Sequence, residues 1–177
     1  LVSGGAGFIG SNLIEYLLKK GEKVVCIDNF LNGAYQNISK FNKNPKFKLI
    51  EQCVIEDIDE EISMIWHLAC PASPKYYYQN PIYTSNIIFQ GTLNLLNYAL
   101  KKNAKFLLAS TSEIYGETKE LPMKENYYGN VKTTSRRSCY SEAKRLAETL
   151  CYDFYRKYSL DIRIARIFNT YGPNMSN

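Results

Sequence analysis

Short apolar runs alternate with longer amphipathic stretches along this chain of 177 residues. Several of the runs are rich in β-branched residues, which is typical of buried parallel strands. After Leu1 and Val2, which would end a first strand, the expected strands are 23–27, 47–51, 63–69, 105–109 and 162–167. The stretches between them predict helices over 8–20, 82–102 and 140–157, with a short helix and loop over 34–46. Strands that alternate with helices predict an α/β fold with a doubly wound parallel sheet.

The first amphipathic stretch shows a clear helical period. Ile9, Leu13 and Leu17 fall on one stripe, and Gly21 is placed to end the helix. The polar segment 117–138 has no such period, and we interpret it as an active-site loop because the helix after it carries candidate chemistry. No internal repeat interrupts the pattern, so residues 1–177 are expected to form one domain.

Composition and charge exclude several classes of protein. The chain is 45% hydrophobic and 22% charged, which is typical of a globular domain and not of a disordered one. Its net charge of +5 is spread over the chain, so we interpret the basic residues as solvated helix ends and loops and expect no nucleic-acid partner. No apolar run approaches the roughly 18 residues that would cross a membrane, and no signal peptide is visible.

The cysteines indicate a reducing compartment. Five of them are scattered without a C-x-x-C pair, which favours free thiols over a disulfide framework or a metal site. We therefore expect a cytoplasmic protein without a metal. Both ends of the chain look trimmed, because it opens at the end of a strand and closes in the loop 172–177. A targeting or membrane segment lost upstream is the alternative that this leaves open.

Three glycines near the start predict a dinucleotide site. Gly4, Gly7 and Gly10 recur at a spacing of three, between an apolar stub and an amphipathic stretch. In a strand–turn–helix unit the first glycine permits the turn, the second admits a pyrophosphate, and the third lets the helix approach the sheet. This strand–turn–helix motif is typical of a Rossmann-like fold. A plain glycine-rich turn is the alternative interpretation.

Asp28 stands where such a site places its acidic residue. It closes the second expected strand, 18 residues after Gly10. A carboxylate there binds the adenosine ribose hydroxyls and repels a 2′-phosphate, so it favours NAD over NADP. The alternative is a strand-end aspartate that opens an Asn-rich turn.

The sole histidine, His67, lies inside the apolar run 63–69. A histidine among apolar neighbours is typical of a hydrogen-bonded core residue, so we predict a structural role and not a catalytic one. The segment 70–74 then breaks the strand at its carboxyl end, where open α/β sheets bind ligands.

Tyr140 and Lys144 form a second candidate site. A spacing of four places both on one face of a helix. An adjacent ammonium group stabilises a phenolate, so we expect Lys144 to lower the pKa of Tyr140 toward the working range. Such a tyrosine can take a proton from a sugar hydroxyl while a hydride leaves for NAD. The alternative is an ordinary tyrosine beside a surface lysine.

A hydroxyl-rich triplet, Thr111-Ser112-Glu113, follows the strand 105–109. The hydroxyl groups can bind a substrate oxygen that is being oxidised, and the carboxylate can orient the substrate or move protons. A helix-capping cluster is the alternative. The conjunction of this triplet, the glycine turn and Tyr-x-x-x-Lys is much rarer than any one of them.

Together these residues resemble the extended short-chain dehydrogenase/reductase superfamily. Within it, the segments 68–74, 108–116, 137–140 and 165–173 look like the UDP-glucuronate decarboxylase (UDP-xylose synthase) family. The Thr-Ser-Glu triplet and the Pro-Ala-Ser-Pro stretch are the family-specific parts. Sugar-nucleotide dehydratases usually carry Asp-Glu where Ser112-Glu113 stands, and 4-epimerases usually lack the glutamate.

The resemblance implies a reaction and a set of roles. Tyr140, assisted by Lys144, deprotonates the C4 hydroxyl of a UDP-sugar as hydride passes to NAD. The 4-keto sugar then loses its C6 carboxylate as CO2, and returned hydride gives UDP-xylose with NAD regenerated and still bound. Thr111 and Ser112 hold the C4 oxygen, and Glu113 assists positioning or proton transfer.

The same resemblance implies the residues that contact each ligand. Besides Tyr140 and Lys144, those expected at the cofactor are Gly4, Gly7, Phe8, Ile9, Gly10, Asp28, Asn29, Leu31, Asn32, Val54, Leu68, Ala69, Cys70 and Thr170. Those expected at the substrate are Pro71, Ser73 and Asn169. A homodimer built as a four-helix bundle from 82–102 and 140–157 is also implied.

The chain departs from the family in three places. Cys53 stands where the family has an acid that contacts adenine, so that contact is expected from backbone groups. Asn86-Ile87-Ile88 replaces a Lys-Thr-Asn run, so substrate contacts from that helix do not carry over residue by residue. The C-terminal substrate domain, which often supplies a substrate-binding arginine, is largely absent from this chain.

Three functions follow, in different classes. The first is the decarboxylase. The second is a related sugar-nucleotide 4,6-dehydratase or 4-epimerase. The third, suggested by Cys53 and the altered helix entry, is a degenerate non-catalytic NAD-binding protein.

Overall fold

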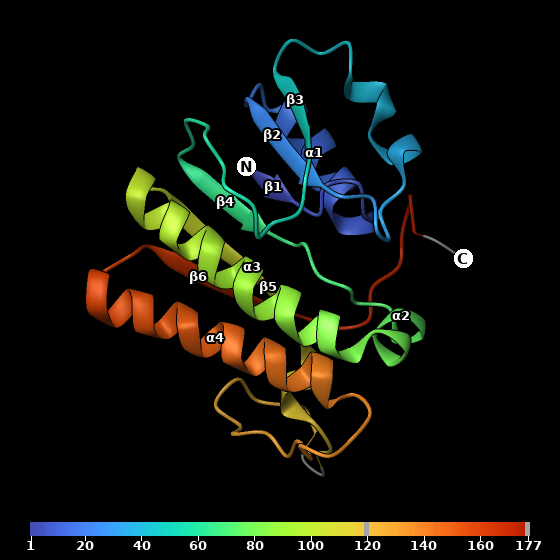
Figure 1. The fold of residues 1–177 in the computed structure, drawn as a ribbon, viewed down its shortest axis with the longest axis vertical. Helices are drawn as coiled ribbons and strands as arrows, with labels where there is room; N and C mark the ends of the chain where they lie inside the picture. The colour runs from blue at the N-terminus through green and yellow to red at the C-terminus, as the bar shows by residue number, and fades with distance from the viewer. Residues whose placement is uncertain (119–120, 176–177) are drawn as a thin grey trace.

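In the computed structural model, which describes residues 1–118 and 121–175, six parallel strands form one sheet in the order β3-β2-β1-β4-β5-β6 (Figure 1). The strands are β1 (Val2–Ser3), β2 (Val24–Asp28), β3 (Phe47–Glu51), β4 (Met64–His67), β5 (Lys105–Thr111) and β6 (Ile162–Ile167). The chain steps outward from β1 to β3 on one side and then from β4 to β6 on the other. This reversal confirms the predicted Rossmann-like, doubly wound α/β sheet.

The helices lie on the two opposite faces of the sheet. They are α1 (Phe8–Lys19), α2 (Pro74–Gln79), α3 (Pro81–Lys102) and α4 (Ser138–Tyr158), with 3-10 turns η1 (Tyr35–Asn37), η2 (Ser39–Phe41) and η3 (Ser112–Tyr115). Helices α3 and α4 pack side by side over β4, β5 and β6, whereas α1 packs against β1 and β2 (Figure 1). Among the described helices, none combines the length and apolarity that a membrane crossing needs.

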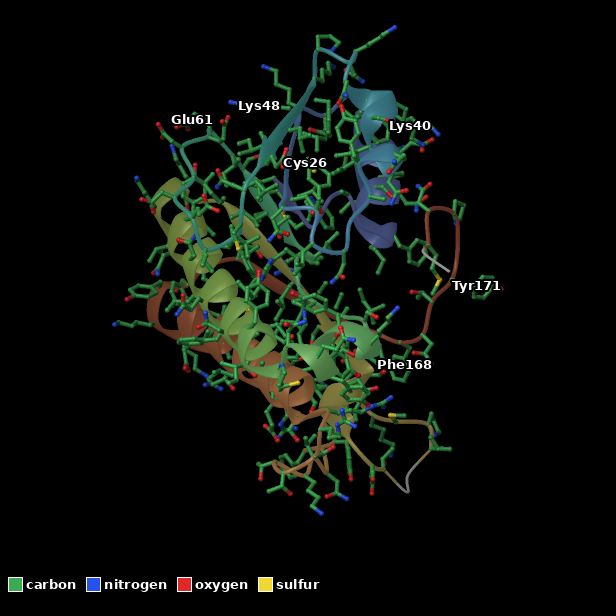
Figure 2. The ribbon with its side chains drawn as sticks, turned by 45° about the vertical axis from the view of Figure 1, so that its right-hand side comes forward. Cys26, Lys40, Lys48, Glu61, Phe168 and Tyr171 are labelled. Carbon is green, nitrogen blue, oxygen red and sulfur yellow. The ribbon has the colours of Figure 1, made fainter. Side chains whose placement is uncertain are left out.

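Two hydrophobic clusters follow from this division. The larger joins α3 and α4 to the sheet and includes Leu95, Leu96 and Phe106. The smaller joins α1 to β1 and β2 and includes Ile14 and Cys26, the latter enclosed among the strands (Figure 2). Because both clusters lie against the sheet, the strand ends that face the ligand site are held from both sides.

Element boundaries differ from the predictions by a few residues. Strand β2 includes Asp28 and β5 continues to Thr111, so both residues are held in the sheet. Helix α4 begins at Ser138, two residues earlier than expected. The segment 34–46 contains two 3-10 turns, with Ile38 buried between them and Phe41 buried at the end of the second. Residues 119–120 of the predicted loop and 176–177 at the chain end lie outside the described residues.

Helix α2 was not predicted from the sequence. It is only six residues long, and it lies between Pro74 at its first turn and Pro81 at the start of α3. Its three consecutive tyrosines show no apolar period, and only Tyr77 is buried. The segment therefore carries no periodic signal of a helix, although proline at the first helical position is a known helix signal.

His67 is a buried structural residue, as predicted. Thr92 Oγ1 donates to the Ile88 carbonyl at 2.7 Å, so it accepts from His67 Nε2 at 3.2 Å. The other nitrogen, Nδ1, then accepts from Ser3 Oγ at 2.8 Å. This assignment fixes the neutral Nε2–H tautomer, and burial lowers the pKa of His67 to about 3.

Candidate cofactor and active site

A cleft of about 710 Å³ opens at the carboxyl ends of the parallel strands. Every residue that the sequence assigned to the cofactor, the substrate or the chemistry lines it. The cleft also includes residues that were not assigned from the sequence, among them Gly33, Gln52, Tyr77, Tyr83, Ile87, Ser110, Arg137, Phe168 and Met175. The fold therefore brings the two candidate sites, the glycine turn and the Tyr-x-x-x-Lys pair, to one cavity, while their individual roles stay predictions.

The glycine turn is wound too tightly for side chains. Gly4 has a φ of +73°, and its N–H donates to the Ile27 carbonyl at 2.8 Å. A Cβ on Gly10 would lie 2.2 Å from the Gly4 carbonyl oxygen, well inside contact distance. At Gly7 a Cβ would approach the same oxygen to 3.3 Å. The turn thus brings bare backbone to the start of α1, which fits a pyrophosphate beside a helix N-terminus.

Asp28 braces this turn as well as facing the cleft. Its Oδ2 accepts from the Ala6 N–H and its Oδ1 from the Phe30 N–H, both at 2.8 Å. Burial raises the pKa of Asp28, and these two hydrogen bonds oppose that rise. Each carboxylate oxygen keeps further acceptor capacity for a ribose hydroxyl. The structural role was not predicted, because the sequence does not show that the strand end touches the turn.

The expected adenine end of the cleft is built from Cys53, Val54 and Tyr83. The Cys53 N–H, one of the backbone groups available there, donates to the Glu56 carboxylate at 2.7 Å. The Tyr83 hydroxyl interacts with the side chains of Asn29 and Cys53, and burial raises the pKa of Tyr83. This end of the cleft therefore presents the Tyr83 ring and the Cys53 thiol, and the Cys53 N–H is already bonded within the protein.

The C-terminal segment reaches the cleft by way of α1. Asn12 Nδ2 donates to the Pro173 carbonyl at 2.8 Å, and Asn174 Nδ2 donates to Ser11 Oγ at 3.1 Å. These contacts tie the segment to α1, and Asn169 and Thr170 line the cleft. The neighbouring Tyr171 side chain points away from the molecule (Figure 2) and is 92% exposed.

Tyr140 and Lys144 both line the cleft, but their coupling differs from the prediction. Lys144 Nζ donates to the Ala109 carbonyl at 2.7 Å and lies 6.0 Å from the centre of the Tyr140 ring. Burial raises the pKa of Tyr140 above its ordinary value, and a hydrogen bond with Thr111 lowers it. The expectation that Lys144 lowers this pKa is wrong for this arrangement, because desolvation of the phenol dominates and the ammonium group is turned toward β5.

The triplet sits at the point where β5 becomes η3. Thr111 caps that turn, with its Oγ1 accepting from the Glu113 N–H at 3.2 Å. The capping alternative is therefore correct for Thr111, which also reaches Tyr140. Because one hydroxyl does both, the turn and the phenol are fixed relative to each other.

A cluster from α2 and α4 surrounds Tyr140. The Tyr77 ring stacks on it, with centres 5.3 Å apart and planes inclined by 8°. Arg137 Nη1 donates to Glu113 Oε1 at 3.1 Å, and Arg137 Nε donates to the Tyr78 hydroxyl at 3.1 Å. Sequence reasoning quoted Arg137 only as part of a motif and missed Tyr77, since α2 itself was missed.

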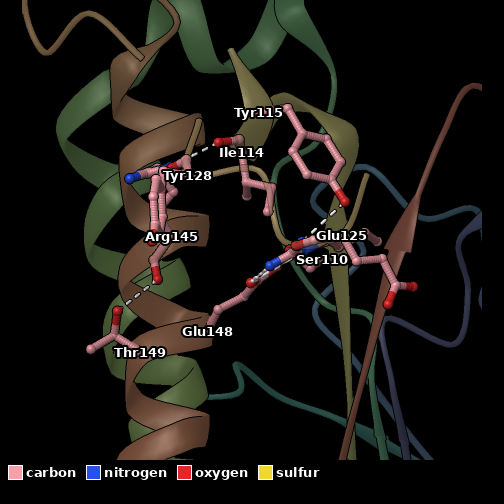
Figure 3. A network of polar contacts seen from close by, with 9 residues as sticks. Ser110, Ile114, Tyr115, Glu125, Tyr128, Arg145, Glu148 and Thr149 are labelled. Atoms are coloured by element: carbon pink, nitrogen blue, oxygen red, sulfur yellow. Dashed lines mark hydrogen bonds and ion pairs between the residues drawn. The ribbon is translucent and has the colours of Figure 1, made fainter. Parts of the chain in front are cut away.

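A second polar network lies behind the cleft and fixes the loop that follows η3 (Figure 3). Buried Glu148 accepts from Ser110 Oγ and from Arg166, whose Nη2 lies 2.8 Å from Glu148 Oε2. Arg166 also donates to the Tyr115 hydroxyl at 3.0 Å. From the next turn of α4, Arg145 donates to the carbonyls of Ile114 and Tyr128. The network ties α4 to β5, β6 and the loop segment that the structure describes.

Known proteins match the whole of this chain. The model of the GDP-mannose 4,6 dehydratase family matches residues 1–177. UDP-glucuronic acid decarboxylase 1 of Arabidopsis thaliana is 51% identical over 99% of this chain and 40% of its own length. UDP-glucuronic acid decarboxylase 3 of the same plant is 49% identical over 99% of this chain and 52% of its own length. The chain thus spans about half the length of the curated relatives it matches.

Solved structures match it in the same way. UDP-glucose 4-epimerase of Thermotoga maritima, solved with UDP-glucose, has a TM-score of 0.85 and 29% identity, over 98% of this chain and 56% of that one. A dTDP-glucose 4,6-dehydratase of Streptomyces venezuelae, solved with NAD, has a TM-score of 0.89 over 98% of this chain and 56% of that one. At 24% identity the second match shows the fold alone.

Proposed function

Because this chain belongs to the GDP-mannose 4,6 dehydratase family, we propose that it is the NAD-binding part of a UDP-glucuronate decarboxylase. The observation that carries the proposal is the meeting of Thr111, Glu113 and Tyr140 at one cleft with the glycine turn. The identity of about half to plant UDP-glucuronic acid decarboxylases supports the choice of that reaction within the family. The relatives extend well beyond the matched part, so a sugar-nucleotide domain is expected to complete the site.

The cleft fits a dinucleotide. The bare backbone of Gly4, Gly7 and Gly10 would hold the pyrophosphate, and Asp28 would accept from the adenosine ribose. Lys144, fixed by the Ala109 carbonyl, would hold the nicotinamide half. When bound, NAD would supply the acceptor for the C4 hydride and return it at the end of the cycle.

Tyr140 would act as the general base at the C4 hydroxyl of the sugar. To accept that proton it must react as the phenolate, which burial disfavours and the hydrogen bond with Thr111 favours. Thr111 would therefore couple substrate binding to deprotonation, because it can also contact the C4 oxygen. Stacking on Tyr77 would hold the ring in place.

Loss of CO2 would follow from the position of the C6 carboxylate relative to the C4 ketone. A β-keto acid breaks the C5–C6 bond and leaves the electron pair on C5 as an enolate, which a proton then quenches. Glu113, in the first turn of η3, lines the cleft and would deliver or direct that proton. Thr111 and Ser112 would hold the C4 oxygen during this step.

We also propose a cytoplasmic homodimer. All five cysteines are free thiols, which supports a reducing compartment. Helix α4 exposes Leu146, Tyr152 and Tyr155 by 43%, 49% and 58%, and apolar groups of this size favour a partner surface. Pairing of α3 and α4 with the same helices of a second copy would cover these side chains. Light scattering of the full-length protein would test this by measuring its molar mass.

Product analysis of the full-length protein tests the proposed reaction. Incubation with UDP-glucuronate should release CO2 and give a UDP-pentose by mass spectrometry, without net consumption of NAD. Loss of water from a nucleotide hexose, or inversion at C4 without mass change, would assign the protein to the dehydratases or epimerases instead. Absence of any turnover together with retained NAD binding would favour the non-catalytic alternative.

A further inference from the structure

Arg137 is placed to meet a substrate at the same point as Tyr140. It is the N-cap residue of α4, and its carbonyl accepts from the Tyr140 N–H at 2.9 Å. A spacing of three puts both side chains on one side of the helix, and both line the cleft. The Arg137 side chain is 51% exposed, so a ligand in the cleft can reach it.

The guanidinium group of Arg137 is held in place by two of its three nitrogens. Its Nε is held by the Tyr78 hydroxyl and its Nη1 by the Glu113 carboxylate. Among the described residues, its Nη2 donates no hydrogen bond. A guanidinium presents its N–H groups as a planar fork that matches a carboxylate, so an oriented fork with a free nitrogen is suited to a second acid.

The neighbourhood would otherwise reject an acidic sugar. Glu113 brings a negative charge to the cleft, and a second carboxylate beside it would be repelled. Arg137 lies against Glu113 and can present a guanidinium nitrogen to each acid, which leaves one net negative charge where there would be two. In a uronate the C6 carboxylate is attached to C5, next to the C4 carbon whose hydroxyl faces Tyr140, so its distance from the first turn of α4 is short.

We propose that Arg137 is the specificity-determining residue for a uronate, with its guanidinium bridging the Glu113 carboxylate and the C6 carboxylate of the nucleotide sugar. This rests on the proposed function for the place of the sugar, and it adds the residue that recognises the acid. The contact exists with the substrate and ends when CO2 leaves. It therefore acts on ground-state binding and discrimination, and on KM more than on kcat.

Binding measurements with two ligands test this assignment. Isothermal titration of the NAD-loaded full-length protein would compare UDP-glucuronate with UDP-glucose, which lacks the charge. Arg137→Gln should weaken UDP-glucuronate about tenfold or more, as expected for loss of a charged hydrogen bond. Its affinity for UDP-glucose should stay within about twofold. Equal losses for both ligands, or no loss for either, would overturn the assignment.

Glu113→Gln separates recognition from positioning. If Arg137 binds the substrate acid, removal of the competing carboxylate should leave UDP-glucuronate bound as tightly as before or more tightly, which is opposite to the effect of Arg137→Gln. If Arg137 acts only by holding Glu113, both variants should weaken UDP-glucuronate alike, and the proposal fails. Both variants would be titrated at the same pH and salt, since ion pairs are screened.

Arg137→Lys covers the case in which the glutamine variant does not fold. It keeps the charge and loses the planar fork, so UDP-glucuronate should still weaken relative to UDP-glucose, by less than in the glutamine variant. An unchanged ratio of the two affinities would count against the assignment. If the wild-type protein binds the uronate through Arg137 but releases no CO2, only the proposed function is refuted. If it releases CO2 but its binding of the uronate does not depend on Arg137, only the role assigned to Arg137 is refuted.

Discussion

His67 should make the stability of this protein fall between pH 7 and pH 5. In the folded protein the imidazole is 2% exposed and neutral, with both nitrogens engaged by Ser3 and Thr92. Burial lowers its pKa to about 3, against about 6.5 in the unfolded chain. Below pH 6.5 the unfolded state binds a proton that the folded state does not. The contribution of His67 is therefore present above pH 6.5 and is lost as the pH falls toward 3.

The magnitude follows from the gap between the two pKa values. Each pH unit inside the window costs about 1.4 kcal/mol, so the free energy of unfolding should drop by about 2 kcal/mol between pH 7 and pH 5. Asp28 acts in the opposite direction, because burial raises its pKa and the folded state then gains stability on acidification. A matched variant is needed to isolate the histidine.

Urea titrations of the full-length protein and of His67→Gln at several pH values make the comparison. The sole tryptophan, Trp66, precedes His67 in β4 and reports unfolding by fluorescence. The variant will be less stable at pH 7, because glutamine cannot satisfy Ser3 and Thr92 with the same geometry. The decisive quantity is the slope: wild type should lose about 2 kcal/mol more than the variant between pH 7 and pH 5. Parallel curves for the two proteins would show that His67 is not held neutral by burial.

Three further predictions test the cleft and its support. Gly10→Ala places a methyl group against the carbonyl oxygen of the turn at 2.2 Å, so NAD affinity measured by calorimetry should fall at least about tenfold. Tyr140→Phe keeps the stacked ring and loses the phenol, so CO2 release should be abolished while the melting temperature and NAD affinity stay close to wild type. Glu148→Gln leaves Arg166 without its carboxylate, and urea denaturation should show a loss of about 3 kcal/mol or more. The control Glu142→Gln removes an exposed i,i+3 pair and should cost less than about 1 kcal/mol; equal losses in the two glutamine variants would contradict the view that Glu148 is a buried partner.

Much of the fold was predictable because its signals are local. The apolar runs are short, β-branched and separated by amphipathic stretches, so the strand and helix periods identify them one at a time. Alternation of the two then restricts the topology to a parallel sheet with crossovers of one hand. Helix α2 was not predicted, because it lacks such a local signal. Its six residues are too few for a period, and its single buried residue, Tyr77, stacks on Tyr140 of α4, which is distant in the sequence.

The candidate site was predictable as a set of positions and not as a set of interactions. The carboxyl ends of parallel strands share one edge of the sheet, so Asp28, Thr111 and the glycine turn had to converge. Helical spacing likewise placed Tyr140 and Lys144 on one face of α4. The sequence does not contain the partner that each group chooses. Lys144 donates to the Ala109 carbonyl, and burial raises the pKa of Tyr140. Both effects depend on how closely β5 packs against α4, which the sequence does not show.

Arg137 is the residue of this cleft best placed to balance the negative charge of an acidic ligand. Asp28 and Tyr140 are neutral when protonated and negative when ionised, so neither can compensate the charge of an incoming acid. Lys144 is 3% exposed, donates to a backbone carbonyl and is assigned above to the nicotinamide half of the cofactor. Arg137 is charged at any working pH and half exposed, and Tyr78 and Glu113 already orient it. If the proposed function holds, selection between an acidic and a neutral sugar would therefore depend on a residue that neither the glycine motif nor the Tyr-x-x-x-Lys motif contains.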